Sequence, residues 1–248
     1  MRNAGYPPRD ARRPAYPSGL STFTRFLRIV NNAGVSVRSV VEHVAETDRL
    51  AQMDVNFRSP MELIRLVLPG MRRKRQGRII NISSVGGMMA MPTMAVYSAS
   101  KFALEGATEA LWYEVRPWNI KVSLIEPGFI NSEGFQKVRY TDQSAASSDG
   151  SLQVYYEHYR HMNRFIEKMM THTGANPENV AKKVVYTIER KHPPLRVMAT
   201  LDAWLFSMLR RFLPRRFYHW ILYRSLPSIG AWGKAKLLAP DDEPQGQV

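Results

Sequence analysis

A tyrosine and a lysine stand four residues apart, at Tyr97 and Lys101, inside a segment with a helical pattern. Side chains at this spacing lie one above the other on the same face of a helix, so the lysine ammonium can reach the space around the phenol. A free phenol titrates at about pH 10, but a fixed nearby cation lowers its pKa. The pair therefore has the chemistry of a general acid or base at neutral pH, with Tyr97 moving the proton.

The tyrosine–lysine pair is accompanied by three polar segments that each follow a short apolar run. They are Asn31-Asn32-Ala33-Gly34, Asn81-Ile82-Ser83-Ser84 and Glu126-Pro127-Gly128. Ser84 lies thirteen residues before Tyr97, and Asn56 lies forty-one residues before it. In this order and at these spacings, the segments resemble those of the classical short-chain dehydrogenase/reductase family. The resemblance covers about residues 28–132 and continues more weakly to about residue 233.

Membership of that family implies hydride transfer between a nicotinamide and a carbonyl or alcohol carbon. The resemblance gives Tyr97 the proton transfer and gives Lys101 the tasks of lowering its pKa and holding the nicotinamide ribose. It makes Ser84 the hydroxyl that bonds the substrate oxygen and Asn56 the residue that steadies a proton-relay water. Taken singly, Tyr97, Ser84 and Asn56 also fit an exposed helix start, a turn and a helix interior. A carbonyl that accepts hydride gains oxyanion character, which two hydroxyl donors stabilise.

Further residues match the family segments that line the cofactor. Asn32, Ala33 and Gly34 resemble the family turn near the adenosine half, where a residue without a side chain lets the backbone approach the cofactor. The segment from Pro127 to Ser132 resembles the one along the nicotinamide, and Ser132 stands where a Thr or Ser bonds the carboxamide. NADP is slightly favoured over NAD. The predicted cofactor-binding set is Asn32, Ala33, Gly34, Tyr97, Lys101, Pro127, Gly128, Ile130 and Ser132.

The sequence holds no glycine-rich phosphate turn of the kind that dinucleotide folds place at a helix N-terminus. Gly5 and Gly19 are the only glycines before Asn31, and neither Gly-x-x-x-Gly-x-Gly nor Gly-x-Gly-x-x-Gly occurs in the chain. We therefore expect a fold that is N-terminally truncated relative to the family and lacks the residue that selects NAD or NADP. The alternative to an active enzyme is a non-catalytic family remnant that serves as an interaction module.

The elements that must position these residues alternate between strand and helix. Near-continuous apolar strands predict a parallel sheet with helices on both faces, a doubly wound, Rossmann-like α/β fold with a helical C-terminal extension. We expect a mobile loop over 141–150, and helix caps at Thr47 with Asp48 and at Asn176, with Pro177 as the first residue of its helix. The predicted strands are a buried strand at 28–30 and strands at 78–82, 121–125 and 195–199; the predicted helices are 47–75, 96–115, 152–170 and 177–190.

Composition predicts one domain, because 248 residues with 44% hydrophobic side chains suffice for one core. We divide the chain into a poorly ordered basic arm (1–27), a partial Rossmann-like core (28–200), amphipathic basic helices (201–236) and a disordered tail (237–248). The absence of Cys excludes disulfides and thiol catalysis. His158 and His161 have metal-compatible spacing but no third ligand in view, so no metal is expected. No apolar run reaches eighteen residues, which predicts a cytoplasmic protein with membrane association as an open alternative.

The C-terminal helices expected at 202–213 and 215–226 place aromatic and aliphatic residues among arginines, within a chain of net charge +14. Peripheral membrane contact and a hydrophobic lid over the substrate cleft are equally compatible with this pattern. Met88, Met89, Met91 and Met94 suit either an apolar ligand or core filling. We expect a small apolar carbonyl or alcohol substrate (steroid, retinoid or lipid-like), a homo-oligomer formed through the helices of Asn56 and Tyr97, and no nucleic acid.

Overall fold

The computed structural model describes residues 27–132, 138–149 and 153–234. A four-stranded sheet in the order β1-β3-β4-β6 forms its centre, and all neighbouring strands are parallel. In register, Ile79 lies opposite Ile29 on one side and Val122 on the other. The parallel sheet confirms the expected fold class. Its strands are β1 (Arg28–Asn31), β3 (Gly77–Ile82), β4 (Ile120–Glu126) and β6 (Arg196–Met198).

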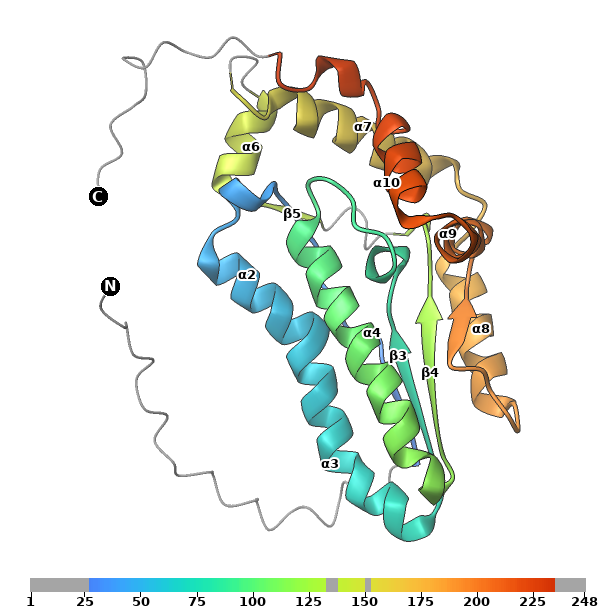
Figure 1. Cartoon of the computed structure of the whole chain (residues 1–248). Helices are drawn as coiled ribbons and strands as arrows, with labels where there is room; N and C mark the ends of the chain where they lie inside the picture. Colours follow the sequence, from blue (N-terminus) through green and yellow to red (C-terminus); the bar gives the residue numbers. More distant parts are fainter. Residues whose placement is uncertain (1–26, 133–137, 150–152, 235–248) are drawn as a thin grey trace.

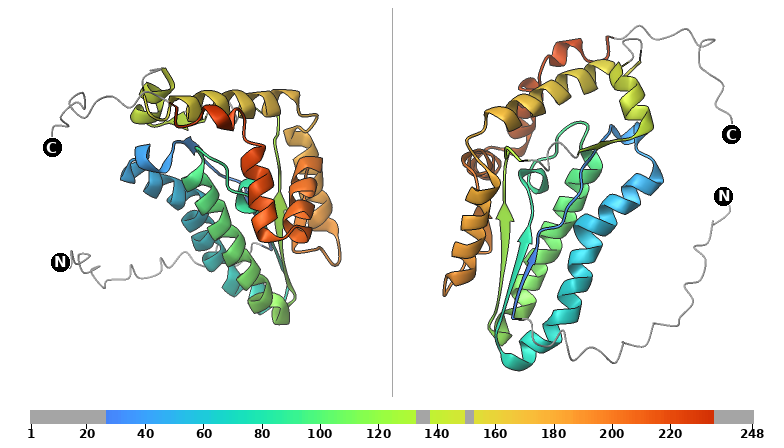
Figure 2. Two further views of the ribbon diagram at one scale, coloured as in Figure 1. Left: turned by 45° about the horizontal axis from the view of Figure 1, so that its top comes forward. Right: turned by 180° about the vertical axis from the view of Figure 1, so that it is seen from behind.

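Helices cover both faces of the sheet (Figure 1, Figure 2). Helices α2 (Glu46–Met53), α3 (Ser59–Lys74) and α4 (Ala95–Val115) lie on one face, and α8 (Pro177–Glu189) lies on the other. Side chains alternate between the faces because successive residues of a strand point to opposite sides. Ile79 therefore packs with the α3–α4 layer, while Ile80 packs with the α8 layer. This is the doubly wound arrangement.

A third group of helices lies at the end of the sheet to which the strands point (Figure 1). It contains α6 (Asp142–Asp149), α7 (Tyr156–His172), α9 (Leu201–Phe212) and α10 (Arg215–Arg224). Phe206 of α9 and Leu222 of α10 pack on a buried cluster of Val85, Met88 and Met89. Short elements complete the described chain: β2 (Val37–Arg38), β5 (Arg139–Tyr140) and the single turns Val41–His43, Val85–Gly87, Arg116–Trp118 and Ile229–Ala231.

The predicted burial of the first strand is wrong. In β1, Arg28 and Val30 are exposed, and Val30 keeps 39% of its surface accessible. The reason is topological, because within the described residues β1 has a single neighbouring strand, β3. An apolar sequence such as Ile29-Val30 indicates a strand but does not reveal whether that strand lies at the edge of its sheet.

The long helix predicted at 47–75 forms, but not with the predicted start. It begins at Glu46, the preceding Ala45 makes no side-chain cap, and Thr47 and Asp48 lie inside the first turn. Acidic side chains there still complement the positive end of the helix dipole. A π-helical turn, Asp54–Arg58, separates α2 from α3 and contains Asn56.

The prediction of a loop at 141–150 is also wrong, since residues 142–149 form helix α6. The Thr141 hydroxyl accepts a hydrogen bond from the Ser144 amide (3.1 Å) and donates one to the His43 carbonyl (3.0 Å). Ser144 and Ser147 are buried, three residues apart on one face of the helix. Small residues, which are typical of loops, here allow close packing of a helix.

Helix α8 confirms its prediction in detail. Asn176 and Asn179 form a reciprocal capping box, with bonds of 2.9 and 3.1 Å, and Pro177 is the first helical residue. Helices α4, α7, α9 and α10 occupy the four remaining predicted helical regions with shifted ends. Among the described residues, no helix combines the length and apolar character that crossing a bilayer requires. The four-part division of the chain stays a prediction.

Candidate active site

The predicted site residues gather beyond the carboxyl ends of β3 and β4. The Ser83 amide donates to the Ile125 carbonyl (2.8 Å), and the Val85 amide donates to the Pro127 carbonyl (2.7 Å). These two bonds hold the loop that carries Ser84 against the segment that begins at Pro127. In open parallel sheets, ligands bind in crevices at this edge.

Tyr97 and Ser84 lie together, as predicted. Ser84 follows β3, and Tyr97 lies in the first turn of α4. Gly86 lies between the two, because a Cβ at Gly86 would fall 2.9 Å from Tyr97 Cε1 and 3.6 Å from Ser84 Oγ. Ser84 Oγ accepts from the Gly86 amide (3.1 Å) and also hydrogen-bonds the Tyr97 side chain. A residue larger than glycine at position 86 would collide with the tyrosine ring.

Lys101 is buried beneath Tyr97, with 5% of its surface accessible. Its Nζ donates to the Ile82 carbonyl (3.0 Å) and lies 5.9 Å from the centre of the Tyr97 ring. A Cβ at Gly34 would lie 3.6 Å from Lys101 Nζ and 3.5 Å from Asn56 Oδ1. The turn after β1, the π-helical turn and α4 therefore meet around the lysine, which brings Gly34 to the other predicted site residues.

The sequence predicts a lowered pKa for Tyr97, and this prediction is wrong. Burial raises the pKa of Tyr97 above its ordinary value, and the hydrogen bond to Ser84 opposes this only in part. Lys101 does not reverse the shift. Burial also lowers the pKa of Lys101 itself, to about 8, against an opposing effect of the Glu105 carboxylate. Loss of hydration thus outweighs the cation–phenol attraction on which the sequence argument relied.

Asn56 connects the turn after β1 to α4. Its Oδ1 accepts from the Val35 amide (2.8 Å), and its Nδ2 donates to the Val35 carbonyl (2.9 Å) and to Ser100 Oγ (3.0 Å). The side chain is 1% exposed. Single π-helical turns are frequent at functional sites, and this one aims a polar side chain at the site. The water-holding role of Asn56 stays a prediction.

The predicted nicotinamide segment is held by two residues that sequence reasoning missed. Thr200 Oγ1 accepts from the Gly128 amide and Asp202 Oδ2 accepts from the Phe129 amide, both at 2.8 Å. A Cβ at Gly128 would lie 2.0 Å from Asp202 Oδ2, so any larger residue there would displace the Asp202 carboxylate. No local motif joins residues more than seventy positions apart. The one available signal is the position of Thr200 and Asp202 at the start of a predicted helix.

A pocket of about 240 Å³ opens beside Ser84 and Tyr97. Of the methionine cluster, Met91 and Met94 line it, whereas Met88 and Met89 are buried and serve the core. Arg38 also lines the pocket and was not predicted. Asn32 and Ala33 are exposed and do not line it. The wall includes Ser83, Ser84, Tyr97, Pro127, Gly128, Phe129, Ile130, Ser132, Ile166 and Met170.

The two candidate metal ligands take other partners. His158 lies against the Trp232 ring, 4.5 Å between centroids, and His161 Nε2 lies 2.9 Å from Glu157 Oε2. The part of the chain that the structure describes contains no group of three or more His, Asp or Glu side chains suited to a metal. Absence of a metal stays a prediction.

Comparisons with known proteins identify the family. The family model of the short-chain dehydrogenases matches residues 20–143. A 3-ketodihydrosphingosine reductase of Bacteroides thetaiotaomicron is 37% identical over 75% of this chain and 67% of its own length. Retinol dehydrogenase 8 of Homo sapiens is 37% identical over 68% of this chain and 54% of its own length. The chain thus spans about half to two thirds of these relatives.

The fold comparison agrees with the sequence comparison. The crystal structure of a short-chain dehydrogenase from Streptomyces avermitilis has a TM-score of 0.65, with 25% identity over 83% of this chain and 71% of that one. Parallel topology, the Tyr97–Lys101 pair with Ser84, and these similarities lead to one conclusion. The chain belongs to the short-chain dehydrogenase family.

Proposed function

We propose that the protein is an NAD(P)-dependent oxidoreductase that interconverts an alcohol with a ketone or aldehyde on a lipid-like substrate. The observation that carries the proposal is the convergence of Ser84, Tyr97 and Lys101 beside a pocket at the carboxyl edge of the sheet. A bound nicotinamide supplies hydride chemistry, which protein side chains cannot supply. The proposed cofactor is NADP or NAD, with NADP slightly favoured.

The residues around the pocket fit the nicotinamide half of such a cofactor. Lys101 Nζ lies 3.6 Å from the position that a Cβ at Gly34 would take, which is the side of the turn where the proposed ribose would bind. The segment from Pro127 to Ser132 supplies backbone and hydroxyl groups along one wall. For the pyrophosphate half, the sequence offers no glycine-rich turn. Cofactor affinity is therefore the property to measure first.

In the reaction, the residues of the chain handle the oxygen and its proton. Ser84 and Tyr97 present two hydroxyl groups to one region of the pocket, so both can donate to a carbonyl oxygen as negative charge develops there. Tyr97 then transfers its proton to that oxygen, and in the oxidative direction it accepts the proton. The charge of Lys101 stabilises the phenolate that results.

The lining favours an apolar substrate. Met91, Met94, Phe129 and Met170 face the same hollow as Ser84 and Tyr97. Ligand pockets are usually about 300–1,000 Å³, so a cavity of about 240 Å³ suits the reacting end of a long molecule. Relatives named for ketosphingosine and retinol support a long apolar substrate with one polar end.

Titration of the purified chain with NADPH and NADH, followed by nucleotide fluorescence, tests the proposal. We expect saturable binding that Lys101→Ala weakens at least tenfold, because the variant removes the charge nearest the expected ribose. Lys182→Ala is the matched control, since Lys182 is exposed and pairs with Glu178 across one helical turn, at 2.9 Å. A folded chain that binds neither nucleotide would overturn the oxidoreductase and favour the interaction module.

We also propose that α9 and α10 contact an anionic membrane surface. Each helix has an inward apolar side, with Phe206 and Leu222 packed on the core, which agrees with the lid interpretation. Each also has an outward apolar side, where Phe212 is 72% and Trp220 54% exposed. Residues 201–224 contain five arginines and one acid, Asp202, a balance of 5 − 1 = +4. Aromatic side chains beside arginines suit a lipid interface.

Cosedimentation with phosphatidylcholine vesicles, with and without phosphatidylserine, measures this contact. We expect binding that needs phosphatidylserine and falls at least fivefold in a variant with Arg215→Gln, Arg216→Gln and Trp220→Ser. The control is Arg73→Gln with Lys74→Gln, which removes two exposed cations from the end of α3. Equal binding to neutral vesicles, or equal loss in the control, would contradict the proposal. Homo-oligomerisation through the helices that carry Asn56 and Tyr97, absence of nucleic acid and cytoplasmic location stay predictions.

A further inference from the structure

A third polar residue continues the row formed by Tyr97 and Lys101. Glu105 follows Lys101 by one helical turn, so the three side chains stand at positions i, i+4 and i+8 on one face of α4. Glu105 is only 4% exposed and Lys101 only 5%. Each of these charges is costly to bury alone, so the burial of a carboxylate one turn from a buried ammonium requires a structural explanation.

The Glu105 carboxylate is anchored on both oxygens. Oε1 accepts from Ser83 Oγ and Oε2 accepts from Arg196 Nη1, both at 2.6 Å. Ser83 directly precedes Ser84 in the chain. A Cβ at Gly87 would lie 2.1 Å from Glu105 Oε1, so the turn after Ser84 passes directly over the carboxylate. Glu105 thus fixes the segment that carries the substrate-binding hydroxyl.

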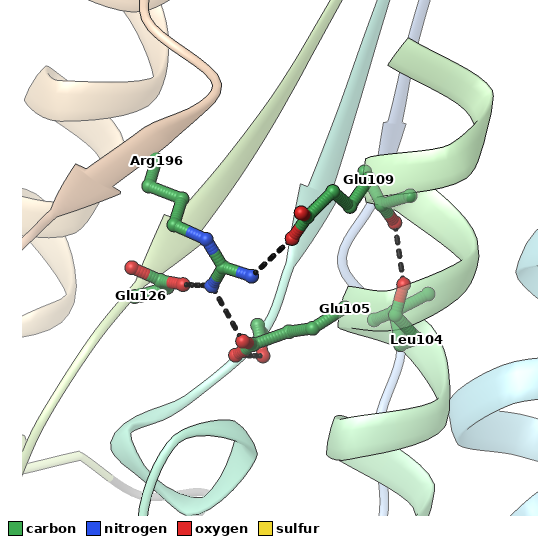
Figure 3. Close-up of polar contacts among 7 residues, drawn as sticks. Leu104, Glu105, Glu109, Glu126 and Arg196 are labelled. Carbon is green, nitrogen blue, oxygen red and sulfur yellow. Dashed lines mark hydrogen bonds and ion pairs between the residues drawn. The ribbon is translucent and has the colours of Figure 1, made fainter. Parts of the chain in front are cut away.

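Arg196 joins three carboxylates from two elements (Figure 3). Besides Glu105, its guanidinium donates to Glu109 Oε2 (3.1 Å) and, in a very short contact, to Glu126 Oε1. Glu126 directly precedes Pro127 at the end of β4. One guanidinium from β6 therefore holds the Tyr97 helix to the strand that leads into the nicotinamide segment.

We propose that Glu105 is a positioning residue of the active site, which keeps Lys101 in its ammonium form and holds Ser83 and Ser84 against Tyr97. The inference rests on the proposed oxidoreductase activity for its kinetic consequences only. Glu109 provides the comparison within the same network. It binds the same guanidinium from one turn further along α4, but it is 46% exposed and lies two turns from Lys101.

The electrostatic surroundings of Lys101 and Glu105 come from α4, from β3 and the turn that follows it, and from β4, β6 and α9. On α4, they are Tyr97 and Glu109; the Ile82 carbonyl at the end of β3 and the Ser83 hydroxyl directly after it are uncharged. Glu126 faces from β4 and Arg196 from β6, while Arg210 and Arg211 of α9 border the same hollow. The Glu105 carboxylate is the one anion in this set that opposes the lowering of the Lys101 pKa by burial.

The test compares Glu105→Gln with Glu109→Gln. Glutamine keeps an acceptor for Ser83 but carries no charge, so the alkaline limb of the kcat/KM profile should move about one pH unit lower. The Lys101 side-chain signal, followed by NMR in 13C,15N-lysine-labelled protein and assigned with Lys101→Arg, should titrate at a correspondingly lower pH. Glu109→Gln should leave the alkaline limb and the Lys101 titration within a few tenths of a pH unit of wild type. Glu105→Asp, which keeps the charge, should return both to their wild-type pH.

The outcomes distinguish a positioning role of Glu105 from a purely structural one. A Glu105→Gln variant with reduced turnover but an unmoved Lys101 titration would overturn the proposal and leave Glu105 a purely structural residue. If wild-type protein turned over no carbonyl probe, the oxidoreductase proposal would fail, while the NMR titration would still test the effect of Glu105 on Lys101. Should Glu105→Gln not fold, the Lys101 titration should stay unmoved in Ser83→Ala and move to lower pH in the double variant Glu105→Ala with Glu126→Gln, which would separate the two tasks. An unmoved Lys101 titration in both variants would overturn the proposal.

Discussion

Replacing Tyr97 with Phe is expected to lower the rate of carbonyl reduction by about 10²–10⁴-fold, the usual contribution of a positioned general acid. The variant keeps the ring, which packs with Met94 and Phe129, and deletes only the hydroxyl. Cofactor affinity should therefore stay within about threefold of wild type. Single-turnover reduction of an aliphatic ketone, combined with NADPH titration, separates the chemical step from binding.

Tyr113→Phe is the matched control for this experiment. Tyr113 lies on the same helix and is 62% exposed, so loss of its hydroxyl should not change the rate. Because burial raises the pKa of Tyr97, the phenol is protonated at neutral pH in the free protein and holds the proton that reduction requires. A Tyr97→Phe variant with wild-type turnover would remove the tyrosine from the mechanism and leave the proposed site without its proton donor.

Much of the sheet and of the catalytic group could be predicted because both depend on local periodicity. Ile79, Ile80 and Val122 belong to continuous apolar runs, which are typical of strands covered on both faces. The i, i+4 spacing of Tyr97 and Lys101 places them on one helix face whatever surrounds the helix. Chain order then brought Ser84 to the same sheet edge, because parallel strands end together.

The parts that the sequence could not supply depend on distant partners. Asp202 binds the Phe129 amide from 73 residues away, and Arg196 reaches Glu105 across 91 residues. No periodicity encodes such pairs. The Tyr97 pKa likewise depends on burial, which is a property of the packed molecule. Helix α6 was missed because Ser144 and Ser147 look like loop residues until the neighbouring surface that covers them is known.

Replacing Arg196 with Met should destabilise the protein by about 3 kcal/mol, the lower end of the range for breaking a buried ion pair. The lower end applies because the Arg196 side chain is 35% exposed. The variant leaves Glu105 and Glu126, which are 4% and 0% exposed, without their cation. Arg211→Met, at an exposed position, is the control and should change the free energy of unfolding by less than about 0.5 kcal/mol. Urea denaturation measures both.

The loss of unfolding free energy caused by Arg196→Met should also depend on pH. The carboxylates around Arg196 determine whether the loss grows or shrinks as the pH rises. Burial and the neighbouring Glu105 raise the pKa of Glu126 to about 7, against an opposing effect of Arg196. When an acidic group has a higher pKa in the folded than in the unfolded protein, the protein loses stability as the pH rises from the unfolded-state pKa to the folded-state pKa. Wild-type protein therefore loses this contribution up to about pH 7, where Glu126 ionises in the folded state.

Without Arg196 the pKa of Glu126 rises further, so the variant continues to lose stability above pH 7 where the wild type does not. The difference between the two free energies of unfolding should widen from pH 6 to pH 8.5, and Glu126→Gln added to Arg196→Met should abolish the widening. A difference that stayed constant with pH would mean that Arg196 acts through packing alone. A difference that widened in acid would contradict the charge balance of the cluster, because protonation removes the repulsion that Arg196 offsets.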